Sequence, residues 1–126
     1  MKLDYIANIN EHGDNLVRLY DCDRAQAERL RDIIKAKLII SKTDLELTSL
    51  DFIEARNCNL TLRLSNEDIG IEEVKNMQFY CDLTYESYVK MVALLEPFCN
   101  KETKGHQYLY EVDSLTDLLF SPAGTW

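Results

Sequence analysis

The chain has 126 residues, a formal net charge of −8 at pH 7, 46% hydrophobic residues and only four Gly and two Pro. This composition is typical of a globular protein and excludes a fibrous or disordered chain, and the length predicts one domain over residues 1–126. A surface of negative charge repels phosphate backbones and anionic lipid heads. We therefore expect neither nucleic acid nor membrane binding, and a basic protein is the natural electrostatic partner.

The N-terminal segment and the cysteines indicate the compartment. Asp4 and Asn8 interrupt the apolar run that a signal peptide needs, and no later segment approaches the ~20 apolar residues of a membrane span. The four cysteines are widely spaced and none lies at a zinc-binding interval: Cys22, Cys58, Cys81 and Cys99. We expect a cytoplasmic protein with reduced thiols and no cofactor.

The excess of acid lies almost wholly in the second half of the chain. Residues 1–63 carry 11 acids and 10 bases, whereas residues 64–126 carry 11 acids and 4 bases. This asymmetry favours an acidic surface formed by the second half, which a basic partner would complement. The alternative is that the acidity serves only to keep the protein in solution.

The first third of the chain predicts a β-hairpin followed by a helix. Apolar residues alternate from Leu3 to Ile9 and resume over 16–20, with a Gly-containing turn at 11–15 between them. Asp23 and Gln26 have the spacing of a capping box at a helix start. The apolar positions that follow share one face of a helix that ends near its last member: Ala27, Leu30, Ile34 and Leu38.

The middle of the chain predicts further strands. The apolar period is two from Asp44 to Ser65, but it changes phase near Thr48 and Ser49, which indicates a bulge or bend. Leu60, Leu62 and Leu64 alternate with polar residues, as in a strand with one buried face, and residues 57–59 form the connection before it. The acidic stretch 65–73 is expected to be a loop.

The last third predicts a strand, a second helix and a closing unit. Met77, Phe79 and Cys81 mark the strand, and Thr84 caps a helix that Pro97 should end near residue 96. A final strand is expected over 108–112. Ser114 and Asp117 form the capping signature of a short C-terminal helix.

These elements predict an α+β protein. Runs of strands between helices favour a two-layer fold with a largely antiparallel sheet of about six strands, two main helices on one face and a short C-terminal helix. A strand, an acidic turn and a helix occur twice, at 16–38 and at 77–99. The two units are either a duplication or two ordinary units with the same helical period.

Three aspartates follow the strands of this repeated unit. If the two strands lie side by side, Asp21, Asp23 and Asp82 meet at one sheet edge, and hard divalent cations prefer such oxygen clusters. They are the candidate catalytic residues of an alternative function, a small divalent-metal-dependent enzyme or metal-binding protein. In the structural interpretation, Asp23 caps a helix and the other two face the positive ends of helices.

The remaining catalytic signals are absent. The four glycines are isolated from one another, so no phosphate-binding loop is present, and no Gly-x-Ser-x-Gly nucleophile elbow occurs. The sequence therefore favours a protein without catalytic activity.

Apolar residues that the pattern leaves on exposed positions suggest a binding surface instead. Tyr80 faces away from its buried strand neighbours, Leu94 projects between polar helix residues, and Trp126 ends the chain. Alternatively, the C-terminal tail covers the sheet and buries Tyr80 with Trp126. The main prediction is a non-catalytic protein-interaction module that uses the acidic second half and these residues.

Two further possibilities follow from the pattern. A small-ligand pocket between sheet and helices would be lined by tyrosines: Tyr5, Tyr85, Tyr88 and Tyr110. An exposed edge strand, such as the N-terminal one, would allow a homo-oligomer.

Overall fold

The computed structural model describes residues 1–8, 13–100, 105–110 and 116–122. Within these residues the strands are β1 (Lys2–Ile6), β2 (Asn15–Cys22), β3 (Leu45–Glu46), β4 (Glu54–Ala55), β5 (Asn59–Leu64), β6 (Gly70–Lys75), β7 (Gln78–Leu83), β8 (Gln107–Tyr110) and β9 (Thr116–Pro122). The helices are α1 (Arg24–Ile34), which continues into a π-helical segment η1 (Lys35–Ile40), a 3-10 turn η2 (Leu47–Ser49), and α2 (Tyr85–Asn100).

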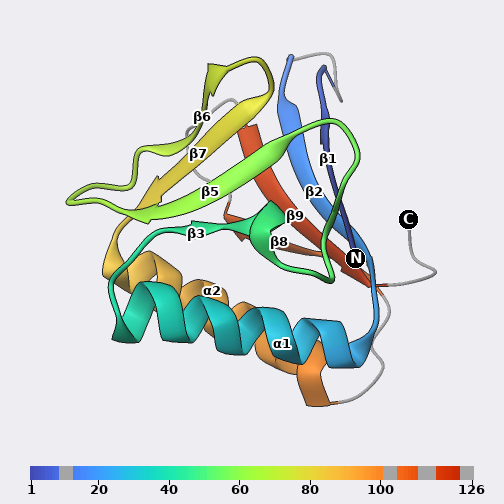
Figure 1. Ribbon diagram of the computed structural model, residues 1–126, viewed down its shortest axis with the longest axis vertical. Coiled ribbons are helices and arrows are strands. Elements are labelled where there is room, and N and C mark those ends of the chain that lie inside the picture. Colours follow the sequence, from blue (N-terminus) through green and yellow to red (C-terminus); the bar gives the residue numbers. More distant parts are fainter. Residues whose placement is uncertain (9–12, 101–104, 111–115, 123–126) are drawn as a thin grey trace.

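The strands form two mixed sheets. Sheet A has the order β4-β1-β2-β9-β8 and sheet B the order β3-β5-β7-β6. The pairs β1/β4, β2/β9 and β5/β7 are parallel, and the other four pairs are antiparallel. The two helices lie side by side beneath both sheets (Figure 1).

The α+β class is confirmed, but the expectation of a largely antiparallel sheet of about six strands is only partly right. The described chain has nine strands in two sheets, and three of the seven pairs are parallel. The expected C-terminal helix is wrong over 116–122, which form β9, while Ser114 lies outside the described residues. Since β9 pairs with β2 and β8 and its side chains are nearly all buried, tertiary pairing overrides the local capping signature.

The predicted pairing of the first two strands and the predicted capping box are confirmed, while residues 9–12 of the predicted strand and turn lie outside the described residues. β1 and β2 pair as an antiparallel hairpin with Leu3 opposite Leu19. The Asp23 carboxylate accepts the Gln26 amide at 2.8 Å and the Gln26 side chain accepts the Asp23 amide at 3.1 Å, which completes the capping box. The change of phase near Thr48 corresponds to the turn η2.

Other boundaries differ from the sequence pattern. Pro97 lies inside α2, because Phe98 and Cys99 are buried and hold the last turn against the core. The Phe98 ring stands 4.9 Å from Phe120 of β9. The expected loop over 65–73 contains the start of β6, which pairs with β7.

The N-terminal strand is not an exposed edge. β4 pairs with the start of β1, and the Asn57 side chain forms hydrogen bonds with the backbone of Tyr5, further along β1. Its carbonyl accepts the Tyr5 amide at 2.8 Å and its amide donates to the Tyr5 carbonyl at 3.0 Å, as a neighbouring strand would. This covering blocks the edge that the sequence suggested for a homo-oligomer.

One buried cluster joins both sheets and both helices. The Tyr5 ring of sheet A lies 4.7 Å from the Phe79 ring of sheet B, so the two sheets contact each other directly. α1 contributes Ala27, Leu30 and Ile34 to the same cluster. The fold therefore depends on contacts between segments that are far apart in the sequence.

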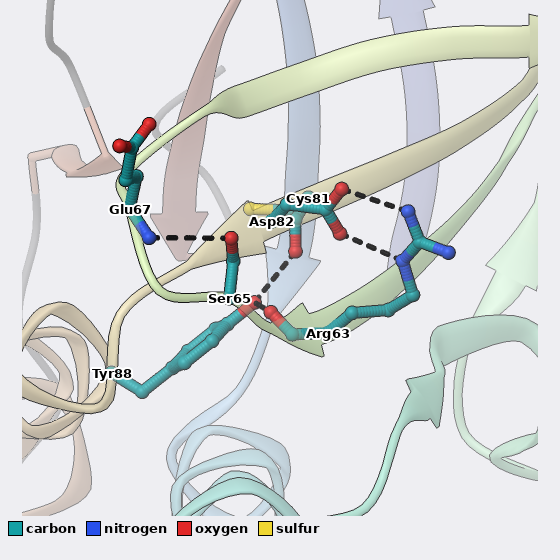
Figure 2. Close-up of polar contacts among 6 residues, drawn as sticks. All are labelled: Arg63, Ser65, Glu67, Cys81, Asp82 and Tyr88. Atoms are coloured by element: carbon teal, nitrogen blue, oxygen red, sulfur yellow. Dashed lines mark hydrogen bonds and ion pairs between the residues drawn. The ribbon is translucent and has the colours of Figure 1, made fainter.

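Tyr88 connects α2 to sheet B from inside this core (Figure 2). Its side chain is fully buried, and its hydroxyl lies 2.7 Å from the carbonyl oxygen of Cys81 and 2.8 Å from that of Arg63. The hydroxyl donates its one hydrogen to these two acceptors, which belong to the parallel strands β7 and β5. Burial raises the pKa of Tyr88, which favours the protonated hydroxyl that donates this hydrogen.

We expect Tyr88→Phe to lower the free energy of unfolding by about 1–3 kcal/mol, since it leaves two buried carbonyl groups without this donor. Tyr85→Phe is the matched control on the same helix, because Tyr85 is exposed. Its effect should stay within about 0.5 kcal/mol. Urea denaturation followed by circular dichroism measures both, and equal stabilities of the two variants would contradict the assigned role of Tyr88.

Candidate functional site

The structure does not bring the three candidate aspartates together. Asp21 belongs to β2 in sheet A and Asp82 to β7 in sheet B. The Asp21 carboxylate lies 3.5 Å from the Lys2 ammonium, and Asp23 caps α1. Asp82 accepts two hydrogen bonds of 2.7 Å from the Arg63 guanidinium.

Each aspartate therefore has a structural partner of its own. In residues 1–8, 13–100, 105–110 and 116–122, no group of three or more His, Cys, Asp or Glu residues could hold a metal ion. The capping role expected for Asp23 is confirmed, whereas Asp82 pairs with a side chain rather than with a helix end. Nothing in this arrangement supports the metal-dependent alternative.

The outer face of sheet B has a different character. Register places Glu46 opposite Thr61, Thr61 opposite Tyr80, and Tyr80 opposite Glu72, so one row crosses all four strands. The alternate residues of the central strands are buried in the core, among them Leu62 and Cys81. We call this partly exposed surface the acidic face and define it by six residues: Glu46, Thr61, Arg63, Glu72, Tyr80 and Asp82. Register places Lys75 at the margin of this face, opposite Gln78.

Arg63, the base beside Tyr80 on the acidic face, is already neutralised. Figure 2 shows the Arg63 guanidinium paired through two nitrogens with Asp82, and its carbon also lies 3.8 Å from the centroid of the Tyr80 ring. The hydrogen bond to Asp82 raises the pKa of Arg63. The Glu46 carboxylate accepts a hydrogen bond from a neutral donor, the Asn59 amide, at 3.0 Å. The face therefore keeps an excess of negative charge beside a partly exposed aromatic ring.

The predicted binding residues lie in different places. Tyr80 is on the acidic face, and its expected orientation away from Phe79 and Cys81 is confirmed by the burial of those two side chains. Leu94 is half-buried on α2, outside the acidic face. Trp126 lies outside the described residues, so its predicted role stays a prediction.

Leu94 lines a cavity of about 410 Å³ between α2 and β8. Its other lining residues are Asp68, Ser87, Lys90, Gln107, Tyr108, Leu109 and Tyr110. Of the four tyrosines expected around a ligand pocket, only Tyr110 lies here. Tyr5 packs against Phe79, Tyr88 is fully buried and Tyr85 is exposed, so the tyrosine-lined pocket does not form.

The thiols are poor nucleophiles. All four cysteines are free and buried. Burial raises the pKa of Cys22, Cys58 and Cys81 to about 12, and it also raises the pKa of Cys99. Since the thiolate is the reactive species, these side chains behave as small apolar core residues near neutral pH.

The sequence pattern predicts the polar side of β5. It does not predict that Glu46 and Glu72 lie in the same row of the acidic face. Thr61 and Arg63 alternate with buried leucines, which predicted their exposure. Glu46 and Glu72 belong to strands that meet β5 and β7 only through sheet pairing. Local periodicity contains no signal for that neighbourhood.

Comparison with protein-family models, with curated proteins and with solved structures gave no significant match. Among the described residues, none of the helices has the length and apolar character required to cross a membrane.

We expect the native protein to resist alkylation by iodoacetamide at pH 8. A thiol with a pKa of about 12 is ionised there in only about one molecule in ten thousand. Unfolding in guanidinium chloride should release all four thiols for labelling, which mass spectrometry counts. Rapid labelling of any of the four cysteines before unfolding would contradict the burial described here.

Proposed function

We propose that this protein is a non-catalytic interaction module that binds a basic protein through the acidic face of sheet B. The observation that carries the proposal is the row Glu46, Thr61, Tyr80 and Glu72, which sets an aromatic ring between two carboxylates on an exposed sheet surface. Aromatic residues are enriched at protein interfaces because they combine apolar area with a polar group.

The charges on the acidic face select the kind of partner. Arg63 is engaged by Asp82, so the acids at the two sheet edges have no base of this chain on the same row. Lysine or arginine side chains of a partner would lie close to these acids, beside the Tyr80 ring that Arg63 already covers on one side. Polyanions such as nucleic acids are disfavoured for the same electrostatic reason.

The proposal places the module in the cytoplasm. Free, buried thiols at all four cysteines support this location, because a reducing compartment keeps them in that form.

A second copy of the chain is a poor partner for this face. Pairing two acidic faces would bring the edge acids of one copy against those of the other, and like charges that oppose each other across strands are destabilising. The β6 edge of sheet B is also unsuited to edge-to-edge pairing, since the register shifts between Glu73 and Lys75 and such a bulge disturbs the ladder there.

The test is a pull-down from native lysate with the wild-type chain and with Glu46→Lys/Glu72→Lys. The wild type should retain basic proteins at about 0.05 M salt and lose most of them at about 0.5 M, because screening shortens the range of the attraction. The double variant should lose the same proteins at low salt. Retention of the same set by both chains would overturn the proposal.

A matched control keeps the net charge equal. Glu28→Lys/Asp51→Lys makes the same change of charge at two exposed positions outside the acidic face. This control should bind as the wild type does. Tyr80→Ala separates the aromatic contribution from charge, and we expect it to weaken binding of a captured, purified partner about tenfold, measured by calorimetry.

A further inference from the structure

The cavity between α2 and β8 carries two opposite charges that do not pair with each other. Its volume of about 410 Å³ is in the range of pockets that hold small molecules. Asp68, from the connection between β5 and β6, and Lys90 of α2 both line it. No ion pair joins these two side chains, and Lys90 has no carboxylate partner among the residues that the structure describes. The cavity therefore offers an acid and a base to one ligand.

Hydrogen bonds hold the Asp68 carboxylate in a fixed orientation. It accepts the Thr84 amide at 2.8 Å, and the Ser87 hydroxyl lies 2.8 Å from each of its two oxygens. Burial alone would raise the pKa of Asp68, but these hydrogen bonds outweigh it and lower that pKa, so the group is charged near neutral pH. A carboxylate has about four acceptor sites, so the two donors leave room for a cationic group of a ligand.

The groups of α2 that line the cavity follow a fixed order along the helix. Ser87, Lys90 and Leu94 are three and four residues apart, so they lie on one face of α2. The hydroxyl that binds the acid comes first, the base follows about one turn later, and the half-buried Leu94 comes another turn on. β8 adds the buried side chains of Leu109 and Tyr110 to the lining. The charged groups are thus neighbours, and the apolar group of α2 lies beyond them.

We propose that this cavity binds a free α-amino acid with a large apolar side chain. Asp68 accepts its ammonium group, Lys90 pairs with its carboxylate, and Leu94 packs against its side chain. An α-amino acid carries both charges and its side chain on one carbon atom, which matches two neighbouring charges with an apolar group beyond them. A ligand with only one charge would leave the other charge of the cavity without a partner. The site is separate from the acidic face and does not depend on the function proposed for it.

The test is isothermal titration calorimetry of the full chain with L-leucine, L-methionine and L-phenylalanine. At least one of the three should bind with a Kd below about 1 mM. The same compound without its amino group, and the same compound without its carboxyl group, should each bind at least about tenfold more weakly. Glycine should also bind at least about tenfold more weakly, because it has no side chain to place against Leu94. Absence of binding by all three amino acids, or equal binding by any of these analogues, would overturn the proposal.

A substitution of the exposed base separates recognition from folding. Lys90→Gln should weaken binding of the amino acid at least about tenfold, while its analogue without the carboxyl group should bind the variant and the wild type alike. Lys75→Gln is the matched control, because it makes the same change of charge at an exposed position on β6 that does not line the cavity. It should bind as the wild type does, and circular dichroism should show the same helix content in both variants. An effect of Lys75→Gln equal to that of Lys90→Gln, or full binding by Lys90→Gln, would refute the assigned contact.

Discussion

The contact of the Tyr88 hydroxyl with the carbonyl groups of Arg63 and Cys81 is the constraint on which sheet B depends. β5 and β7 are parallel, so no short turn joins them, and the chain runs through β6 before β7 takes its place beside β5. Tyr88 fastens both strands to α2 from the buried side. With that side fixed, the alternation of the strands places Leu62 and Cys81 in the core and leaves Thr61, Tyr80 and Asp82 half-buried on the outer face. The acidic face is thus a consequence of how the helix holds the sheet.

Some acidic residues of this chain stabilise the fold and others give sheet B a negatively charged surface. The two groups differ in their position in the structure. Asp23 and Asp68 satisfy the backbone at helix starts, and hydrogen bonds from Thr84 and Ser87 outweigh the effect of burial and lower the pKa of Asp68. Asp82 balances Arg63. The row that contains Glu46 and Glu72 has no base to pair with them. These two glutamates, rather than the aspartates at the strand ends, therefore make the surface negatively charged.

The parts of the fold that could be predicted from sequence are those decided by neighbouring residues. The hairpin of β1 and β2, the capping box at Asp23 and the cap at Thr84 all follow from contacts within a few positions. The division into two sheets could not be predicted, because the parallel pairs join strands that are distant in sequence. For the same reason the local pattern predicts a helix where β9 lies between β2 and β8. The same limit applied to the site. Tyr80 was found from its alternation, whereas the acids beside it depend on sheet order.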